Sequence, residues 1–167
     1  MAPYRVFIGL GSNLSDPLQQ LRSARLHIEQ SPLFHDCEAS PIYRSKAVGP
    51  GTQNDYLNAV IGASTSATPL EVLDSLQAIE QKHGRERLVR WGPRTLDLDF
   101  LLAEDQSMDH PRLSLPHPRL HERNFVLKPL LDLAPDTCLP DGRPLNTMPA
   151  AQCTDGLNLS NLNWKPE

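Results

Sequence analysis

Two aspartates separated by one residue, Asp97 and Asp99, are the side chains of this sequence that point most directly to chemistry. Side chains alternate along a β-strand, so a strand over residues 95–102 places both carboxylates on one face. Thr95 shares this face, and the opposite face receives Leu96, Leu98, Phe100 and Leu102. Positions two apart on a strand are roughly 7 Å apart at Cα, a span suited to hard cations such as Mg²⁺. Because acids also occur on exposed edge strands, the pair alone does not identify a metal site.

A basic segment precedes the acidic pair and contains four arginines, Arg85, Arg87, Arg90 and Arg94. Glu86 is its only acidic residue. Guanidinium groups bind phosphate oxygens and stabilise charge that develops during phosphoryl transfer. Glycine and proline in this segment are typical of a loop that moves over a ligand. Trp91 either packs at the base of such a loop or covers a flat ring. Together with the acidic pair the segment indicates phosphate chemistry, although solvated charged loops share this composition.

A third group of polar side chains follows in the order His117, Arg119, His121 and Arg123. Zinc binding would require a third ligand at suitable spacing, which this part of the sequence lacks. Contact of His117 and Arg123 with phosphate groups agrees better with the acidic pair. Isolated surface histidines are common, so this assignment depends on where the fold places them.

Two features earlier in the chain suggest contact with a flat ligand. Gly9 and Gly11 lack the third glycine of the dinucleotide fingerprint and the Gly-Lys-Ser/Thr of a phosphate loop. We therefore interpret residues 9–14 as a tight turn whose backbone approaches a ligand. Asn58 lies within an apolar strand segment, where its amide either bonds to neighbouring strands or faces a polar ring. Its donors and acceptor match the amide-like edge of a heterocycle.

The elements that position these residues follow from periodicity and capping signals. We expect strands over 4–10, 33–45 (disturbed by Pro41), 56–64 and 95–102; helices from Ser15-Asp16-Pro17 to Ser31-Pro32, from Thr68-Pro69 to about His83, and from Glu122 to Leu133 with an interruption at Pro129; and a polar, loosely packed tail from about residue 150. The first six elements have the order of a ferredoxin-like βαββαβ sandwich, an α+β fold with a mainly antiparallel sheet and helices on one face. We predict one domain over residues 1–167.

Composition excludes several classes of function. The chain has 167 residues, 39% of them hydrophobic, and a net charge of -4, which argues against a general nucleic-acid binder. No apolar run reaches membrane-spanning length, and the amino terminus has no signal-peptide layout. Cys37, Cys138 and Cys153 form neither a zinc pattern nor a disulfide framework. We expect a cytoplasmic monomer that acts on small molecules, without nucleic-acid or membrane partners.

With these residues in view, the sequence resembles the 6-hydroxymethyl-7,8-dihydropterin pyrophosphokinase family of folate biosynthesis. The segment 90–99, Arg-Trp-Gly-Pro-Arg-Thr-Leu-Asp-Leu-Asp, is similar to the family signature. The resemblance extends over roughly residues 4–148 through these further segments: 11–14, 43–45 with Gly49, 55–59, 116–119, 122–127 and 140–142. It implies transfer of pyrophosphate from ATP to the pterin hydroxymethyl oxygen, with release of AMP.

The resemblance also implies a role for individual residues. Two Mg²⁺ ions would be bridged by Asp97 and Asp99. The catalytic side chains would be Arg85 and Arg94, with Arg87 and Trp91 on the mobile loop. ATP, the co-substrate, would lie among Gln77, Glu80, Phe100, Arg112 and Ser114, with His117 and Arg123 on its phosphates. The pterin would contact Tyr56, Asn58 and Phe125 and backbone groups near Ser45 and Val48. No general base is evident.

Two positions depart from the family pattern, and three alternatives to the implied function need to be weighed. Phe100 replaces an aliphatic residue next to the nucleotide, and Ser45 replaces a threonine, which matters little if only its backbone serves. A different metal-dependent nucleotide or sugar-nucleotide transferase would use the same aspartates without a pterin pocket. An RNA-binding ferredoxin-like module would need exposed aromatics and a positive sheet face, which the 5% aromatic content and net charge of -4 disfavour. A degenerate, non-catalytic relative is disfavoured by the intact acidic pair.

Overall fold

The computed structural model describes residues 2–14, 16–46, 55–85 and 96–165. Its elements are β1 (Tyr4–Ser12), α1 (Pro17–Gln30), β2 (His35–Ala39), β3 (Tyr43–Ser45), β4 (Tyr56–Thr65), α2 (Pro69–Glu80), the π-helical turn η1 (Gln81–Arg85), β5 (Asp97–Ala103), β6 (Met108–His110), β7 (Leu113–Leu115), the 3₁₀ turn η2 (Leu120–Glu122), α3 (Asn124–Leu133), the 3₁₀ turn η3 (Leu145–Thr147), α4 (Pro149–Gln152) and β8 (Leu157–Leu159). No helix in the described ranges is long and apolar enough to cross a membrane.

Both long helices begin at the caps that the sequence predicts. The Asp16 carboxylate accepts a hydrogen bond from the Gln19 N–H at 3.4 Å, and Pro17 follows in the first turn. Thr68 and Glu71 form a reciprocal capping box in front of α2. These side chains satisfy amide groups that a helix start leaves without intrahelical partners, which is why the boundaries were readable from sequence.

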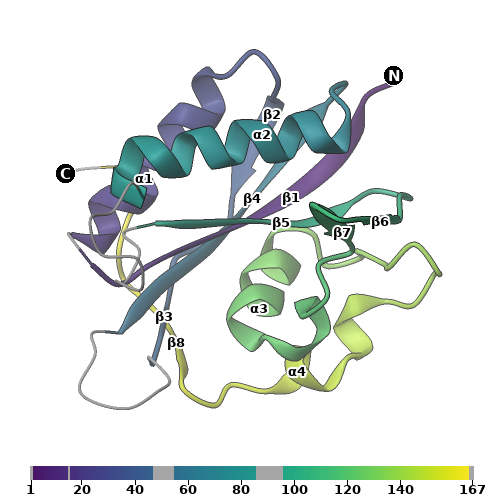
Figure 1. Cartoon of the computed structure of the whole chain (residues 1–167). Coiled ribbons are helices and arrows are strands. Elements are labelled where there is room, and N and C mark those ends of the chain that lie inside the picture. Colours follow the sequence, from purple (N-terminus) through teal and green to yellow (C-terminus); the bar gives the residue numbers. More distant parts are fainter. Residues whose placement is uncertain (1, 15, 47–54, 86–95, 166–167) are drawn as a thin grey trace.

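The main sheet has the strand order β5-β1-β4-β3-β8, and β2 pairs with the carboxy-terminal half of β4 (Figure 1). Every pairing in this sheet is antiparallel. The predicted βαββαβ core is therefore confirmed, with β2 and β3 as the two pieces of the predicted second strand. The break falls at Pro41, which has no N–H to donate. Ser40 bridges the break, because its hydroxyl accepts from the Val60 N–H at 2.9 Å.

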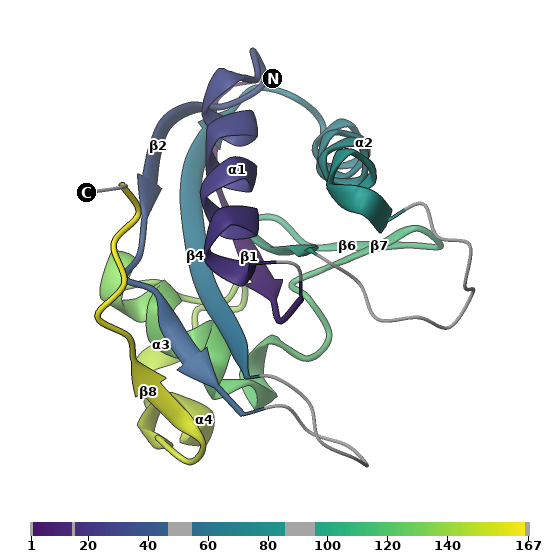
Figure 2. The same cartoon turned by 90° about the vertical axis from the view of Figure 1, so that its left-hand side faces the viewer.

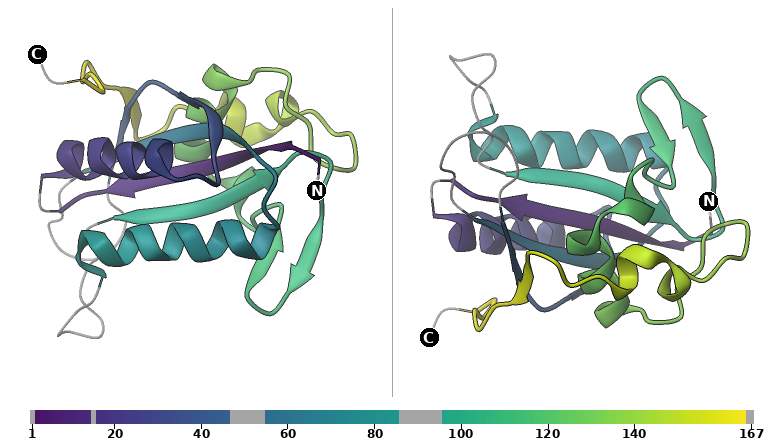
Figure 3. Two further views of the ribbon diagram at one scale, coloured as in Figure 1. Left: turned by 90° about the horizontal axis from the view of Figure 1, so that it is seen from above. Right: turned by 90° about the horizontal axis from the view of Figure 1, so that it is seen from below.

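Helices cover both faces of the sheet, which differs from the expected single face. Helices α1 and α2 lie on one face, and α3 and α4 lie on the other, as Figures 1 and 2 show and as the two opposite views of Figure 3 make plain. The expectation of one covered face holds only for the two helices of the βαββαβ core. The apolar residues of α3, including Val126, Leu127 and Leu130, are buried against the second face.

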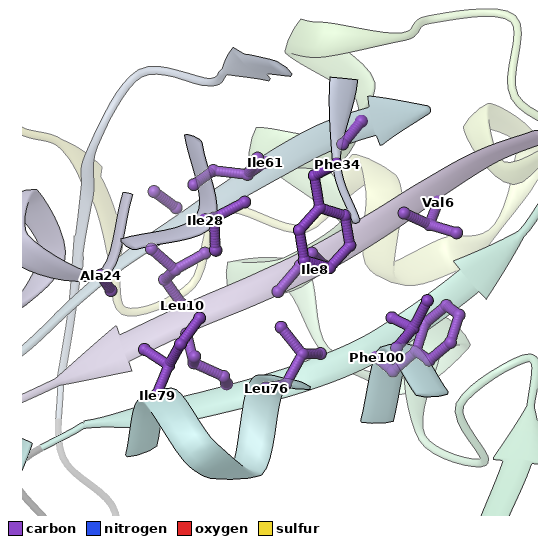
Figure 4. Close-up of a cluster of buried hydrophobic side chains, with 14 of the residues drawn as sticks. Val6, Ile8, Leu10, Ala24, Ile28, Phe34, Ile61, Leu76, Ile79 and Phe100 are labelled. Carbon is purple, nitrogen blue, oxygen red and sulfur yellow. The ribbon is translucent and has the colours of Figure 1, made fainter. Parts of the chain in front are cut away.

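The core beneath α1 and α2 is built from alternate residues of the central strands (Figure 4). Val6, Ile8 and Leu10 of β1 point to this side, where they meet Ile28 of α1 and Leu76 of α2. All five side chains are at most 2% exposed. The intervening residues of β1, among them Phe7, point to the α3 side.

The alternation of β5 is interrupted, so one predicted side-chain position is wrong. Phe7 of β1 pairs with Leu102 and Ile8 pairs with Phe100, which leaves Leu101 as an extra residue in β5. This β-bulge puts Leu101 and Leu102 together in the α3-side core. Leu102 was expected beside Phe100, which lies on the α1/α2 side. The bulge follows the two aspartates, so their predicted common face is unaffected.

The carboxy-terminal tail is also better ordered than its polar sequence predicts. Strand β8 pairs with β3 and extends the sheet, and Leu157 is 7% exposed. Beyond it, the Trp164 indole N–H donates to the Ser40 carbonyl at 2.7 Å. The expectation of a loosely packed tail is therefore wrong for residues up to 165. The polar sequence misled because these contacts use mainly backbone groups, which side-chain hydropathy does not report.

Candidate active site

A pocket of about 510 Å³ opens on the α3 face of the sheet, where β1, β4 and β5 meet the start of α3. It collects residues that lie far apart in the sequence: Gly9, Leu10, Gly11, Ser45, Lys46, Tyr56, Asn58, Ala59, Asp97, Asp99, Arg119, Glu122, Arg123, Phe125 and Val126. Both predicted metal ligands, four of the five predicted pterin residues and Arg123 are among them. Lys46, Arg119 and Glu122 were not predicted as site residues.

The floor of this pocket is glycine. Gly11 pairs with Asn58 on one side and with Asp97 on the other, and Gly9 pairs with Asp99. A Cβ atom at Gly11 would lie 3.3 Å from the Asn58 Nδ2, so a larger residue would crowd the amide. The expected turn over 9–14 is wrong at its start, because β1 stays extended and paired through Ser12. The backbone does approach the pocket, as expected, but as part of a strand.

Asn58 is held by Ser45. The Ser45 hydroxyl donates to the Asn58 Oδ1 at 2.6 Å, and the two residues are only 8% and 7% exposed. This bond occupies one acceptor position of the amide oxygen and fixes the orientation of the amide. The Ser45 side chain, and not only its backbone, therefore contributes to the pocket, because its hydroxyl orients Asn58. Tyr56 and Phe125 line the same pocket and offer flat apolar surface beside the amide.

Asp97 and Asp99 share one face of β5, as predicted. This face is the one towards α3, and both residues line the pocket. The Asp99 Oδ2 is 4.0 Å from the Arg123 Nη1, and the Asp99 side chain is 42% exposed. Within the described ranges, no three His, Cys, Asp or Glu side chains gather as a ready-made metal cage. Two carboxylates are nevertheless what Mg²⁺ takes from a protein when phosphates and water complete its shell. The donor set thus fits magnesium bound together with a phosphate ligand.

A second hollow of about 330 Å³ adjoins the first, and Asp99 lines both. Six of the seven residues predicted around ATP line it: Gln77, Glu80, Phe100, Arg112, Ser114 and His117. The Arg112 guanidinium contacts the Asp74 carboxylate and lies 3.3 Å from the Gln77 Oε1. The seventh residue, Arg123, lies in the first pocket, with its Cζ 5.7 Å from the centre of the Phe125 ring.

His117 lines the second hollow and has a defined tautomer when neutral. Its Nδ1 accepts from the Arg119 backbone N–H at 3.2 Å, so a neutral ring carries its proton on Nε2. Burial lowers the pKa of His117, the nearby Asp99 carboxylate opposes this, and Arg123 and Arg119 lower it further. The neutral ring offers one N–H donor for an anionic or polar ligand.

Glu80 has a structural contact that the sequence did not reveal. Its Oε2 accepts from the Leu98 N–H at 2.9 Å, and the residue is 3% exposed. Leu98 is the residue between the two aspartates, and β5 has no strand neighbour on this side in the described sheet. Glu80 therefore satisfies the Leu98 N–H, which no strand of the described sheet reaches.

Several predicted residues fall outside the described ranges. Arg87, Trp91, Arg94 and Val48 are among them, so their predicted roles stay predictions. Arg85 closes the π-helical turn η1, and only its backbone is described.

Comparison with known proteins agrees with this arrangement. Residues 7–135 match the family model of 7,8-dihydro-6-hydroxymethylpterin-pyrophosphokinase. A Pseudomonas aeruginosa protein named 2-amino-4-hydroxy-6-hydroxymethyldihydropteridine pyrophosphokinase is 48% identical over 153 residues, which are 92% of this chain and 94% of that protein. A Haemophilus influenzae protein of the same name is 46% identical over 137 residues, 82% of this chain and 86% of that protein.

Solved structures share the fold at low sequence identity. A Plasmodium falciparum HPPK-DHPS structure superposes with a TM-score of 0.68 at 14% identity, over 87% of this chain and 45% of that longer chain. A further HPPK-DHPS structure in complex with substrates gives a TM-score of 0.71 at 11% identity, over 91% of this chain and 44% of the other. Likeness at this level of identity supports the fold alone.

Proposed function

The chain belongs to the 7,8-dihydro-6-hydroxymethylpterin-pyrophosphokinase family and is a pyrophosphokinase of folate biosynthesis; from this premise we propose how it works. ATP is the donor, Mg²⁺ is required, and the acceptor is the hydroxymethyl oxygen of 6-hydroxymethyl-7,8-dihydropterin. The products are the pterin pyrophosphate and AMP. The packing of the described helices and of the two-stranded β6-β7 sheet around one six-stranded sheet further supports a single pyrophosphokinase domain.

One observation carries the proposal: two hollows of different chemistry meet at Asp99. The first has an oriented amide and two aromatic side chains, which suit a flat heterocycle with an amide-like edge. The second is bordered by Arg112, Gln77 and Ser114, which suit a polar nucleotide. Two substrates bound in adjoining hollows bring donor and acceptor together at their boundary, and such positioning supplies a large part of phosphoryl-transfer catalysis.

In the pterin pocket, we assign Asn58 to the heterocycle edge and Tyr56 and Phe125 to its faces. The Ser45 bond supports this assignment, because it holds the amide in place before a ligand arrives. Preorganised polar groups lose little entropy on binding, which favours affinity and orientation together. Backbone groups near Ser45 and Val48 would complete the contacts.

At the boundary, Asp97 and Asp99 would hold the Mg²⁺ ions, which when bound neutralise phosphate charge and align the phosphates. Arg123 and His117 reach the same boundary from the start of α3 and the segment before it. Their donors suit phosphate oxygens. The remaining catalytic assignments, Arg85, Arg87, Trp91 and Arg94, rest on the sequence resemblance, and we assign them to charge stabilisation and exclusion of water.

The decisive assay incubates the protein with ATP, Mg²⁺ and 6-hydroxymethyl-7,8-dihydropterin and identifies the products. We expect AMP and the pterin pyrophosphate in equal amounts. Release of ADP with a monophosphorylated pterin, or no dependence on the pterin, would contradict the proposal.

A companion variant, Asn58→Ala, tests the pterin pocket separately. We expect the KM for the pterin to rise and the KM for ATP to change little, because Asn58 lies in the first pocket only. Another metal-dependent nucleotidyl or sugar-nucleotide transferase would show no pterin dependence for Asn58 to alter.

A further inference from the structure

A carboxy-terminal segment outside the family-matched residues 7–135 runs along the pterin side of the sheet. We call residues 153–165 the strap. Within it, β8 pairs with β3 residue by residue, Leu157 opposite Ser45 and Leu159 opposite Tyr43. Two flanking backbone bonds lengthen this ladder, from Lys46 N–H to the Gly156 carbonyl at 3.1 Å and from Ser160 N–H to the Ile42 carbonyl at 3.0 Å. The strap therefore covers the outer edge of β3 completely.

Both ends of the strap are anchored to other elements. At its start, the Asn124 Nδ2 donates to the carbonyls of Cys153 and Asp155 at 3.2 and 3.1 Å. At its end, the Trp164 Nε1 donates to the Ser40 carbonyl at 2.7 Å. The Arg22 Nη2 donates to the Asn163 carbonyl at 2.6 Å. Chain ends are normally mobile unless they are tied down, and this one is tied at both ends of a strand.

These anchors contact the two elements that line opposite sides of the pterin pocket, α3 and β3. Asn124, at the start of α3, lies between Arg123 and Phe125, which line the pocket from one side. Strand β3 carries Ser45 on the other side, with Tyr56 of β4 as its inner pairing partner and Leu157 of the strap as its outer one. The Ser45 hydroxyl then reaches Asn58 at 2.6 Å.

A strand of three residues has few backbone bonds and opens readily when one of its edges is unpaired. If β3 moved by a few tenths of an ångström, the 2.6 Å bond from Ser45 to Asn58 would lengthen and the amide would be free to turn. Pairing on both sides removes this freedom.

We propose that the strap is a positioning element of the pterin pocket: by holding β3 between β8 and β4, it keeps the Ser45 hydroxyl on Asn58 and so aims the Asn58 amide at the bound heterocycle. This inference rests on the proposed function, because it takes the pterin to be the ligand of Asn58. The strap residues themselves touch no substrate.

The experiment compares binding of 6-hydroxymethylpterin, followed by its fluorescence in the presence of Mg²⁺ and a non-hydrolysable ATP analogue, with binding of the analogue alone. In the full chain, Trp164→Ala and Arg22→Ala each release the far end of the strap. Arg22→Ala alters a partly exposed side chain of α1, so it keeps the test valid if Trp164→Ala folds poorly. In both variants the bond from Ser45 to Asn58 loses its alignment, so we expect pterin affinity to fall about three- to tenfold. Analogue affinity should change by less than about twofold.

A matched control is Tyr4→Phe, which also deletes one side chain to backbone bond, from the Tyr4 hydroxyl to the Ala67 carbonyl at 2.8 Å. Tyr4 lies outside both hollows. We expect this variant to lower the melting temperature without changing pterin affinity. If the strap variants lose no more pterin affinity than Tyr4→Phe does at a comparable drop in melting temperature, the strap merely adds stability and the inference is wrong.

A double-mutant cycle tests the route through Ser45. Ser45→Ala should reduce pterin affinity by itself, and adding Trp164→Ala should cause no further loss, because the strap then has no hydroxyl to position. Additive losses would overturn the inference. Asn58→Ala distinguishes failure of this inference from failure of the proposed function. Unchanged pterin affinity in Asn58→Ala would refute the pterin pocket itself. Reduced affinity in Asn58→Ala together with normal affinity in Trp164→Ala would refute only the role of the strap.

Discussion

The two faces of the sheet are built from the same three strands but do different work. On the α1/α2 face, β1, β4 and β5 contribute an uninterrupted apolar layer that includes Ile8, Ile61 and Leu98. On the α3 face, the intervening positions of the same strands contribute a second apolar core, with Phe7, Val60 and Leu101, and also the pocket residues Gly11, Asn58 and the two aspartates. Alternation thus lets one strand stabilise the fold with every second residue and carry the site with the others. Where the strands line the pocket, stability and activity should therefore separate by face, and variants on either side can test this.

The largest expected effect is at the two aspartates. Asp97→Ala or Asp99→Ala should reduce Mg²⁺-dependent AMP formation by at least about a thousandfold, since each removes a charged group that we propose as a metal ligand. The melting temperature should stay close to that of the wild type, because the two carboxylates repel each other and neither is fully buried. Rate measurements over a range of Mg²⁺ concentrations, with circular dichroism melts, check both parts. A folded double variant with retained activity would remove the metal assignment.

The neighbouring residue on the apolar face should behave in the opposite way. Leu98 is 6% exposed, so Leu98→Ala should cost about 2–5 kcal/mol of unfolding free energy. Urea denaturation measures this cost. At a temperature where the variant is fully folded, kcat should fall far less than in Asp99→Ala. Loss of activity without loss of stability would show that the two faces are not separable at this strand.

Glu80 links the two faces and should affect both properties. Glu80→Ala leaves the buried Leu98 N–H without its 2.9 Å acceptor, which should cost about 1–3 kcal/mol of unfolding free energy. The activity of folded protein should fall as well, because Leu98 lies between Asp97 and Asp99, the proposed metal ligands. Glu80→Gln retains an acceptor oxygen and should recover most of the stability. Equal destabilisation by both variants would mean that the carboxylate charge, rather than the bond to Leu98, matters.

The glycine floor should give a smaller and more specific effect. A Cβ at Gly11 would lie 3.3 Å from the Asn58 Nδ2, so Gly11→Ala should shift the amide and raise the KM for the pterin about three- to tenfold. The KM for ATP serves as the internal control and should be nearly unchanged. Parallel increases in both KM values would point to a general disturbance of β1.

The smallest effect concerns pH and lies in the helix layer. His27 of α1 is 5.3 Å from His83, ring centre to ring centre. Burial, followed by His83 and Lys82, lowers the pKa of His27. The stability it contributes is present above its unfolded pKa of about 6.5 and is lost as pH falls through the lowered folded value. Solvent screens this half-exposed group, so His27→Gln should reduce the fall in melting temperature between pH 7.5 and 5.5 by only about 1 °C. An unchanged fall would place the acid sensitivity elsewhere.

The core of the fold was predictable because its signals are local. The Asp16-Pro17 and Thr68-Pro69 caps, together with the strand alternation around Asp97 and Asp99, are each confined to a few residues. The strap was not predictable, because it is held by backbone pairing and by distant carbonyls such as that of Ser40. The second helical layer was expected as a helix, but nothing local showed which face of the sheet it covers.

The sequence predicts which side chains line the site, but it does not predict the hydrogen bonds between them. Asn58 was assigned to the pterin from its chemistry and the family resemblance, an assignment that stays a prediction. Its bond to Ser45 depends on the register that sets Tyr43 opposite Asn58 and Ser45 opposite Tyr56. Register between strands is not encoded in spacing along either strand. For the same reason, the contact between Glu80 and Leu98 could be seen only in three dimensions.

The extra residue in β5 divides that strand into two segments with different phase. Upstream of Leu101, odd-numbered residues face α3; at the bulge, Leu101 and Leu102 both do. Deleting Leu101 would leave Phe100 opposite Ile8 and Leu102 opposite Phe7, so the carboxylates and Leu102 would keep their face and the α3-side core would lose one leucine. The orientation of the acids is therefore set by the residues up to Phe100, and a designed transplant of the Asp-x-Asp segment can omit the bulge, whose extra residue fills the α3-side core.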